Sequence, residues 1–245
     1  MRSIQAFKAI KKDLNAVMLH DPAARNKFEA AICYSGFHAL VMYRFCHFLH
    51  VHRYFFIARM LSGLTRFFTG IEIHPGAKIG SGVFIDHGAG VVIGETAEVG
   101  NNVIIYQGVT LGGSGKDKTG KRHPTVEDNV MICSGAKVLG PFTVGTGAKI
   151  GAGSIVLNEV PPNATVVGVP GRVTRIAGKR VDDLNQALPN PVDEDINDLK
   201  ARILALEQKL TATDNTDNAA RQPNGKATAI SARQNTSSND GSDHE

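Results

Sequence analysis

The chain of 245 residues has no tryptophan and only three cysteines, Cys33, Cys46 and Cys133. The spacing of these cysteines matches neither a disulfide framework nor a metal site, which favours a reduced, cytoplasmic setting. The N-terminus lacks the apolar segment of a secretory signal peptide, so we expect none. These absences argue against a secreted, disulfide-bonded protein.

Strong charge of one sign and long hydrophobic runs are missing as well. The formal net charge is only +4 and the basic residues are scattered, so the composition does not require a nucleic-acid partner. The most apolar run, residues 54–68, contains Arg59 and Arg66, which argues against a membrane span. The length allows one or two domains with a sizeable core.

What the sequence does contain is a period of six residues. An aliphatic residue recurs at every sixth position, with a slip of two residues after Ile85 and a longer interruption after Leu111. The thirteen positions are Ile73, Ile79, Ile85, Ile93, Val99, Ile105, Leu111, Val126, Ile132, Val138, Val144, Ile150 and Val156. Glycine follows six of them, and repeats of this period are typical of parallel β-helices.

The period dictates the geometry of the predicted β-helix. Each hexad supplies one short strand with its aliphatic residue pointing inward, and glycine permits a tight turn. Three hexads close a triangular coil of about eighteen residues, and the coils stack about 4.8 Å apart. We take the left-handed winding from the repeat class, because it breaks the right-handed crossover rule. An antiparallel sandwich would also alternate, but it does not require an exact phase of six.

Residues 1–70 predict an α-helical domain, so the fold class is α+β. Asp21-Pro22 predicts the start of a second helix, with Asp as N-cap and Pro at the first helical position. Ser35-Gly36 marks a break before a third helix over 37–50, and a fourth helix runs from about Tyr54 to Gly70. Four histidines in this region lack acidic or cysteine neighbours at ligand spacing, so we expect packing histidines and no metal; they are His38, His47, His50 and His52.

The C-terminal part predicts little structure. Residues 71–172 contain the β-helix, and 173–192 read as a polar linker. Residues 193–211 carry an apolar stripe at heptad spacing, which fits either an isolated amphipathic helix or a short coiled coil on a trimer axis. Residues 212–245 are polar and predict disorder.

The polar residues that interrupt the repeat are the candidates for a site. Asp86-His87 falls at the slip, and Glu72 precedes His87 by nearly one coil. A carboxylate bonded to one imidazole nitrogen leaves the other as a proton acceptor, which suits activation of a hydroxyl. The insertion over 112–124 ends in a second polar pair, Arg122-His123, at an edge where such insertions often bind ligands. Pattern alone favours the simpler interpretation of Asp86-His87 as turn residues bonded to backbone.

Several motifs together give a resemblance that covers about residues 21–172. They are HDPA (20–23), GFHAL (36–40), IEIHPGAKIG (71–80), DHGAGVVIGETA (86–97), VTLGG (109–113), RHP (122–124), GAKIGAGSIV (147–156), VPP (160–162) and GVPGR (168–172). The sequence resembles the serine acetyltransferases among the hexapeptide-repeat acyltransferases. Strings of the GAKIG type occur throughout that superfamily, whereas DPA with GFHAL, DHG with GET, and TLGG with RHP are specific in combination.

The resemblance implies a direct acetyl transfer. His87 would be the general base that takes the proton from the L-serine hydroxyl, which attacks the thioester of acetyl-CoA to give O-acetyl-L-serine and CoA. Glu72 would orient His87, although the family often has Asp at that position. No covalent acyl-enzyme and no metal are expected.

The resemblance also implies the binding residues. Asp21 and Asp86 match positions that hold the substrate ammonium, and Arg122 and His123 match those that hold its carboxylate. The residues implied for the coenzyme line a groove between two prisms; they are Gly112, Gly113, Cys133, Ser134 and Lys149. The family commonly has Gly and Ala where this chain has Cys133 and Ser134.

Assembly and regulation are implied in the same way. Family members form homotrimers about the prism axis, and many pair two trimers through the helical domain. L-cysteine commonly inhibits by feedback, and some members dock a C-terminal Ile into O-acetylserine sulfhydrylase. This chain ends in Asp-His-Glu, so we do not count on that docking.

Three other functions fit the same fold class. An acetyltransferase of a sugar would share the fold but should lack the DPA segment and the RHP loop. A β-helical carbonic anhydrase needs three zinc-binding histidines, and the repeat region offers only His74, His87 and His123, with no pair five apart. A β-helical assembly subunit without catalysis would have no need of the charged set around His87.

Overall fold

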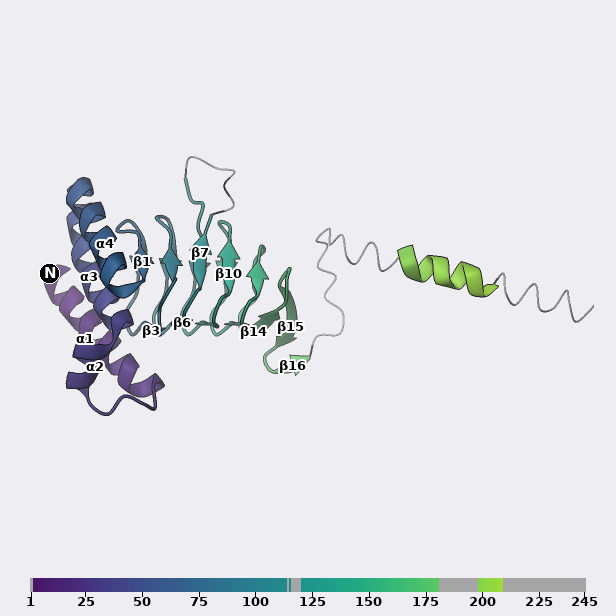
Figure 1. Cartoon of the computed structure of the whole chain (residues 1–245), viewed down its shortest axis with the longest axis horizontal. Helices are drawn as coiled ribbons and strands as arrows, with labels where there is room; N and C mark the ends of the chain where they lie inside the picture. The colour runs from purple at the N-terminus through teal and green to yellow at the C-terminus, as the bar shows by residue number, and fades with distance from the viewer. Residues whose placement is uncertain (1, 114, 116–119, 181–197, 209–245) are drawn as a thin grey trace, which may run out of the picture. The chain divides into compact units, whose positions relative to one another are not determined.

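The computed structural model describes residues 2–113, 115, 120–180 and 198–208. The chain divides into two compact units, residues 1–187 and 188–245. In the first unit four helices precede a succession of short strands, and the strands form the regular coils of a β-helix (Figure 1). The predicted helical region followed by a parallel β-helix is thereby confirmed.

The four helices are α1 (Arg2–His20), α2 (Lys27–Cys33), α3 (Ser35–Val51) and α4 (Phe55–Thr69). Helix α4 ends as predicted, because Gly70 adopts the left-handed conformation with φ of 71° that closes a helix C-terminus. The predicted start of a helix at Asp21-Pro22 is wrong. The Asp21 carboxylate instead accepts the backbone N–H of Ala23 in a turn, and helix α2 begins later, capped by the side chain of Asn26.

The strands of the first unit are short. They are β1 (Glu72–Ile73), β2 (Lys78–Ile79), β3 (Phe84–Asp86), β4 (Val92–Ile93), β5 (Glu98–Val99), β6 (Ile104–Tyr106), β7 (Thr110–Gly112), β8 (Thr125–Val126), β9 (Met131–Ile132), β10 (Lys137–Leu139), β11 (Thr143–Val144), β12 (Lys149–Ile150), β13 (Ile155–Val156), β14 (Ala164–Val167), β15 (Arg172–Ile176) and β16 (Lys179–Arg180). They form three sheets, one for each face of a prism.

The first sheet, called sheet A, has the order β1-β4-β7-β10-β13, and sheet B has the order β11-β8-β5-β2. Sheet C contains β3, β6, β9, β12 and β14, with β15 and β16 added antiparallel at its end. The chain passes from A to B to C in each coil, and pairing between coils is parallel. The antiparallel strands finish the stack after the repeat has ended.

The register shows where the repeat is interrupted. Val92 pairs with Thr110, eighteen positions on, whereas Glu72 pairs with Val92, twenty positions on. Thr110 pairs with Lys137, twenty-seven positions on. The extra residues of the first coil lie between sheets C and A, and those of the insertion lie between sheets A and B. Each interruption therefore enlarges one corner of the prism and leaves the stacked strands intact.

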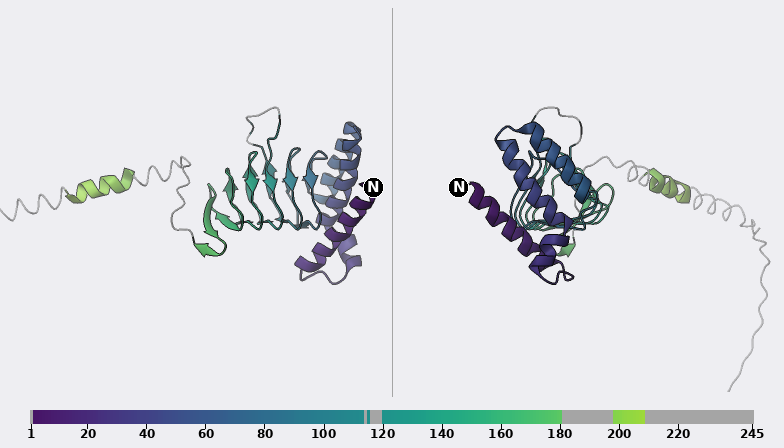
Figure 2. Two further views of the ribbon diagram at one scale, coloured as in Figure 1. Left: turned by 180° about the vertical axis from the view of Figure 1, so that it is seen from behind. Right: turned by 60° about the vertical axis from the view of Figure 1, so that its left-hand side comes forward.

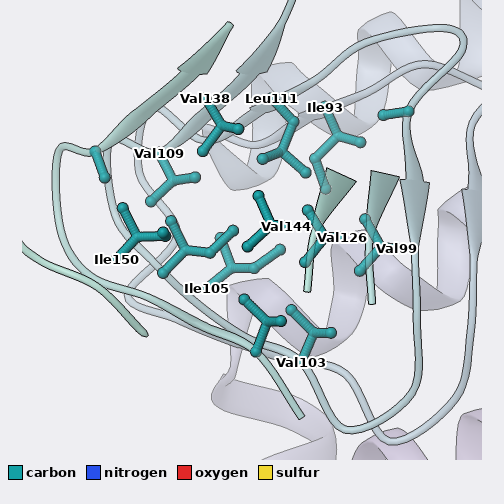
Figure 3. Close-up of a cluster of buried hydrophobic side chains, with 14 of the residues drawn as sticks. Ile93, Val99, Val103, Ile105, Val109, Leu111, Val126, Val138, Val144 and Ile150 are labelled. Atoms are coloured by element: carbon teal, nitrogen blue, oxygen red, sulfur yellow. The ribbon is translucent and has the colours of Figure 1, made fainter. Parts of the chain in front are cut away.

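The interior is a column of aliphatic side chains (Figure 3). Twelve of the thirteen residues at the sixth positions are buried, and Ile79 is half-buried against the same core. Because every coil places its aliphatic residues over those of the previous coil, burial along the prism axis is continuous. Burial of this kind contributes roughly 25 cal/mol for each Å² of apolar surface removed from water.

The helices lie across the N-terminal end of the prism (Figure 2). Asp13 of α1 is 1% exposed and accepts the backbone N–H groups of Gly82 and Val83 at 2.8 and 3.1 Å. Arg44 of α3 pairs with Asp13 and also donates to the carbonyl of Gly80 at 2.8 Å. This buried ion pair fastens two helices to the first coil.

In the second unit, residues 198–208 are helical, inside the range where the sequence predicts a helix. Leu199, Ile203 and Leu206 of its apolar stripe are more than half exposed. Whether this helix forms a coiled coil stays a prediction, and the tail predicted to be disordered, 212–245, lies outside the described residues. Among the described helices, none combines the length and the apolar character that crossing a membrane requires.

Candidate active site

The slip in the repeat builds a sharp corner between β3 and β4, residues 86–91, which we call the His87 corner. His87 has a positive φ of 57°, unusual for a residue with a side chain, and its side chain is 76% exposed. Its Nε2 lies 3.7 Å from a carboxylate oxygen of Asp86. Asp86 ends β3 and pairs in register with Tyr106 of the next coil. The corner thus presents an imidazole and a carboxylate to solvent.

The helices bring Asp21 to the same corner. The Tyr34 hydroxyl donates to one oxygen of Asp21 at 2.5 Å, and the backbone N–H of Ala23 donates to the other at 2.7 Å. These hydrogen bonds, first that of Tyr34, lower the pKa of Asp21, and the nearby charge of His87 acts in the same direction. Ser35 donates from its hydroxyl to the carbonyl of His87 at 3.4 Å. Asp21, Asp86 and His87 are therefore grouped within one chain.

Sequence reasoning points to neither Tyr34 nor Ser35. Tyr34 is the single extended residue between α2 and α3, and Ser35 begins α3 directly before the GFHAL string. Their position beside that motif is the available signal. Only the packing of the helices shows that both side chains turn toward the His87 corner.

Glu72 lies on the outer face of sheet A with its carboxylate beside two arginines of α4. Arg66 donates to it at 2.8 Å, and an Arg59 nitrogen lies 3.5 Å from its other oxygen. Within the described part of the chain, Glu72 and His87 form no ion pair at 4.0 Å or less. The predicted orientation of His87 by Glu72 stays a prediction.

The second polar pair lies at the corner between sheets A and B, residues 94–97 and 120–124, which we call the Arg122 corner. Thr96 accepts the backbone N–H groups of Arg122 and His123 on its hydroxyl at 3.0 and 3.1 Å. Its own backbone N–H donates to Nδ1 of His123 at 3.2 Å. The ring of His123 packs on Gly94, where a side chain would collide with it, and His123 is only 8% exposed. The end of the insertion is thus fastened to the turn between β4 and β5.

The electrostatics of this corner follow from the same contacts. Burial lowers the pKa of His123, and the neighbouring Arg122 lowers it further. The imidazole is therefore neutral near pH 7. Because Nδ1 accepts a hydrogen bond from the backbone N–H of Thr96, Nε2 carries the hydrogen and can donate a hydrogen bond. Arg122 is hydrogen-bonded to Glu95, which holds the guanidinium in place. Glu95 and Thr96 belong to the GET part of the DHGAGVVIGETA motif, and the sequence pattern alone indicates no role for them.

Two further histidines lie near this corner. Burial lowers the pKa of His74, whose ring lies 5.9 Å from that of His50, and the charges of Glu95 and Arg122 also act on it. His74 accepts the backbone N–H of Gly76 through Nδ1. Among the described residues there is no group of three or more side chains suited to hold a metal ion.

The His87 corner and the Arg122 corner lie at opposite ends of β4. The residues that the resemblance suggests for the coenzyme also lie in two separate places on the prism. Gly112 ends β7 on sheet A, with Gly113 beside Arg122, whereas Lys149 lies in β12 of sheet C and Cys133 and Ser134 directly follow β9 of that sheet. One chain therefore presents the two sets on different faces of the prism.

Cys133 does not have the environment of a nucleophile. Burial raises the pKa of its thiol, and Lys149 opposes that rise only in part. The thiolate is the reactive form of cysteine, so a raised pKa disfavours attack by this residue. This agrees with a direct transfer that needs no covalent intermediate.

A three-sided prism of hexapeptide coils is typical of the hexapeptide-repeat proteins, and a family model places part of the chain in that class. The model described as bacterial transferase hexapeptide (six repeats) matches residues 123–158. This match covers the part of the chain in which the coils are most regular. The coils in this part of the chain are thus those of a bacterial transferase hexapeptide repeat.

Comparison with individual proteins is more specific. A serine acetyltransferase of Bacillus licheniformis is 57% identical over 213 residues, which cover 86% of this chain and 98% of that protein. One of Helicobacter pylori is 61% identical over 155 residues, 63% of this chain and 90% of that protein. The chain belongs to the serine acetyltransferase family.

Solved structures agree with this assignment. The serine acetyltransferase of Neisseria gonorrhoeae in complex with serine has a TM-score of 0.67 at 42% identity, covering 69% of each chain. The Brucella abortus enzyme in complex with coenzyme A has a TM-score of 0.67 at 43% identity, covering 68% of this chain and 66% of that one. The N-terminal helices and the β-helix are therefore a shared architecture.

Proposed function

We propose that the chain transfers the acetyl group of acetyl-CoA to the hydroxyl of L-serine, as the first step of cysteine biosynthesis, at a site that two copies build together. The observation that carries this proposal is the separation of two preformed polar groups. Asp21, Asp86 and His87 lie at one corner of the prism, and Arg122 and His123 lie at another. A small zwitterion needs both groups, so a neighbouring copy must supply the second.

His87 is the proposed general base. Its exposed imidazole takes the proton from the serine hydroxyl as the oxygen attacks the thioester carbonyl. The tetrahedral intermediate then collapses, the C–S bond breaks, and the CoA thiolate takes a proton from the imidazolium. A base in this role has to be reachable by substrate, which suits the exposed side chain of His87.

The charges at the two corners match the two ends of serine. The carboxylates of Asp21 and Asp86 suit an ammonium group. Arg122 offers a planar set of donors for a carboxylate, and neutral His123 offers the hydrogen on Nε2. Glu95 and Thr96 position this pair, since both contact it directly.

Glu72 is proposed to orient His87 once substrate is bound. This requires its carboxylate to reach the imidazole from a position where Arg66 and Arg59 now hold it. The substitution Glu72→Gln tests it, because a loss of kcat supports the orienting role. A normal kcat with lowered stability would assign Glu72 to the contact with α4 instead.

The coenzyme is proposed to lie in the groove between two prisms. Gly112 and Gly113 of one copy, on sheet A, would face Cys133, Ser134 and Lys149 of the other, on sheet C. The Brucella abortus enzyme, which shares this fold, is in complex with coenzyme A, and this supports the coenzyme as a ligand here. The absence of side chains at Gly112 and Gly113 lets the pantetheine arm approach the backbone.

A homotrimer is the proposed assembly. A head-to-tail contact that joins one corner to a different corner gives a closed ring when its rotation closes, and we propose that three prisms form such a ring about an axis parallel to their own. Two trimers can pair through the helical domains. The chain is proposed to work in the cytoplasm.

L-cysteine is the proposed feedback inhibitor. One solved serine acetyltransferase, with a TM-score of 0.68 and 44% identity, is a complex with cysteine. Cysteine has the ammonium and carboxylate of serine and would occupy the same two polar groups. Inhibition should therefore be competitive with L-serine.

Release of free thiol from acetyl-CoA tests the proposed function. The purified chain should release CoA when L-serine is added and not when sugars are added. Release that depends on a sugar and not on L-serine would favour the rival acetyltransferase. No release with any acceptor would favour an assembly subunit without catalysis.

A further inference from the structure

Tyr34 occupies a position that no motif explains. It is the single residue between α2 and α3, with an extended backbone at φ −94° and ψ 107°. It stands at the N-cap of α3 but makes no side-chain hydrogen bond to that helix. Instead its side chain crosses to Asp21, thirteen residues earlier in the chain.

The ring of Tyr34 is held firmly enough to fix the hydroxyl. It packs against a buried cluster that includes Val17 of α1, Phe37 of α3 and Phe84 of β3. The ring is therefore anchored on a buried cluster to which α1, α3 and β3 contribute. The hydrogen bond to Asp21 raises the pKa of Tyr34 to about 12, so the phenol remains a donor at neutral pH.

Asp21 is oriented through both of its oxygens. Tyr34 donates to one and the backbone N–H of Ala23 donates to the other. A carboxylate has about four acceptor positions, so two bonds fix its plane and leave capacity for a ligand. A donor on each oxygen also favours the charged form that an ammonium group needs.

A purely structural role does not account for this contact. Asp21 is half-buried and the rest of its turn is largely exposed, so solvent competes for the hydrogen bond from Tyr34 and limits its contribution to the stability of the fold. The buried ion pair of Asp13 and Arg44 already fastens α1 to α3. What the Tyr34 hydroxyl adds is a fixed direction for the Asp21 carboxylate beside Asp86 and His87.

We propose that Tyr34 is a positioning residue of the acceptor site, which holds the Asp21 carboxylate toward the ammonium group of the amino-acid substrate. The inference rests on the proposed function, because it takes an amino acid as the acceptor. It adds a residue outside the recognised motifs and links substrate affinity to the junction between α2 and α3.

The variant Tyr34→Phe tests the inference, since it keeps the ring and removes only the hydroxyl. The KM for L-serine should rise about tenfold, while kcat and the KM for acetyl-CoA stay within about twofold. Tyr54→Phe is the matched control, because Tyr54 is exposed at the start of α4 and makes no cap hydrogen bond. It should leave all three constants unchanged.

A second measurement separates positioning from a structural effect. 3-Hydroxypropanoate is serine without its ammonium group, and its inhibition constant is measured against L-serine with O-acetylserine as the detected product, so that acetylation of the analogue itself does not enter the readout. Tyr34→Phe should weaken the binding of L-serine, raising its KM about tenfold, and leave the inhibition constant of 3-hydroxypropanoate unchanged. Equal weakening of both ligands, or an unchanged KM for L-serine, would overturn the inference.

The wild-type protein is assayed first, so the two proposals fail in different ways. Serine-dependent thiol release by the wild type, with normal serine affinity in Tyr34→Phe, would overturn only the role of Tyr34. The absence of that release in the wild type would overturn the proposed function, and with it the acceptor on which the inference depends.

Discussion

The two corners at the ends of β4 are built in opposite ways. At the His87 corner, a histidine with a positive φ holds 76% of its side chain in solvent. At the Arg122 corner, His123 is 8% exposed, packs on Gly94 and is bonded to Thr96. The first suits a group that must exchange a proton with a substrate. The second suits a rigid surface that holds a charge in one place.

The comparison also teaches how a regular fold acquires a site. Both corners arise where the hexapeptide phase is broken, by two residues at one and by a longer insertion at the other. The strands between them keep their register and their buried aliphatic residues. Polar residues can therefore be added at the corners without a change in the core.

The largest effect is expected at the exposed corner. His87→Asn should lower kcat by about 10² to 10⁴, because a general base is lost. Asn is chosen because it tolerates a positive φ better than most residues, so the turn is kept. Steady-state kinetics check the result, and His52→Asn, at an exposed histidine beside α3, is the control. Nearly normal turnover would remove His87 from the mechanism.

Arg122→Ala should act on binding more than on turnover. Loss of the guanidinium should raise the KM for L-serine by about 10²-fold and change that for acetyl-CoA little, because the carboxylate of serine loses its charged partner. Arg122→Lys keeps the positive charge but lacks the planar guanidinium, so its KM for L-serine should lie between those of the wild type and Arg122→Ala. Equal increases for both substrates would argue against recognition of the serine carboxylate.

The packing of the buried corner can be tested through Gly94. Gly94→Ala places a methyl group on the ring of His123, so we expect a loss of about 1–3 kcal/mol of stability together with weaker serine binding. Gly63→Ala, in the interior of α4 with open space around it, should be neutral or stabilising by up to about 1 kcal/mol. Denaturant unfolding measures both variants. Tolerance of Ala at 94 with full activity would show that the ring position is not critical.

The smallest expected effect is the pH dependence of stability. Because folding lowers the pKa of His123, the unfolded chain binds more protons below the ordinary value of about 6.5. Stability should therefore fall as pH drops from about 7 to 5, and His123→Gln should reduce that fall by about 1 kcal/mol or less. Unfolding curves over this range test it, and an identical slope in the variant would contradict the assigned neutral state.

Much of the β-helix can be predicted because one short pattern dominates its burial. Twelve of the thirteen periodic residues are buried, and the two phase breaks mark both corners. The prediction at Asp21-Pro22 fails because an Asp can cap a helix or close a turn, and the local sequence does not decide between them. The residue that caps α2 is Asn26.

The site can be predicted less completely than the fold. His87, Asp86, Arg122 and His123 stand out as polar breaks in an apolar repeat. Tyr34 does not, because its contact with Asp21 depends on how three helices pack. Glu95 and Thr96 gain their contacts only when the end of the insertion packs against the turn between β4 and β5, which no period in the sequence describes.

A mixed assembly tests most directly whether the two corners of different copies form one site. His87→Asn and Arg122→Ala chains carrying different tags are co-expressed, and assemblies with both tags are purified. In a mixed trimer one interface keeps both intact corners, so at an L-serine concentration near the wild-type KM, where Arg122→Ala sites are almost empty, we predict about one third of wild-type serine-dependent thiol release. Activity no higher than that of the two single variants would contradict a shared site.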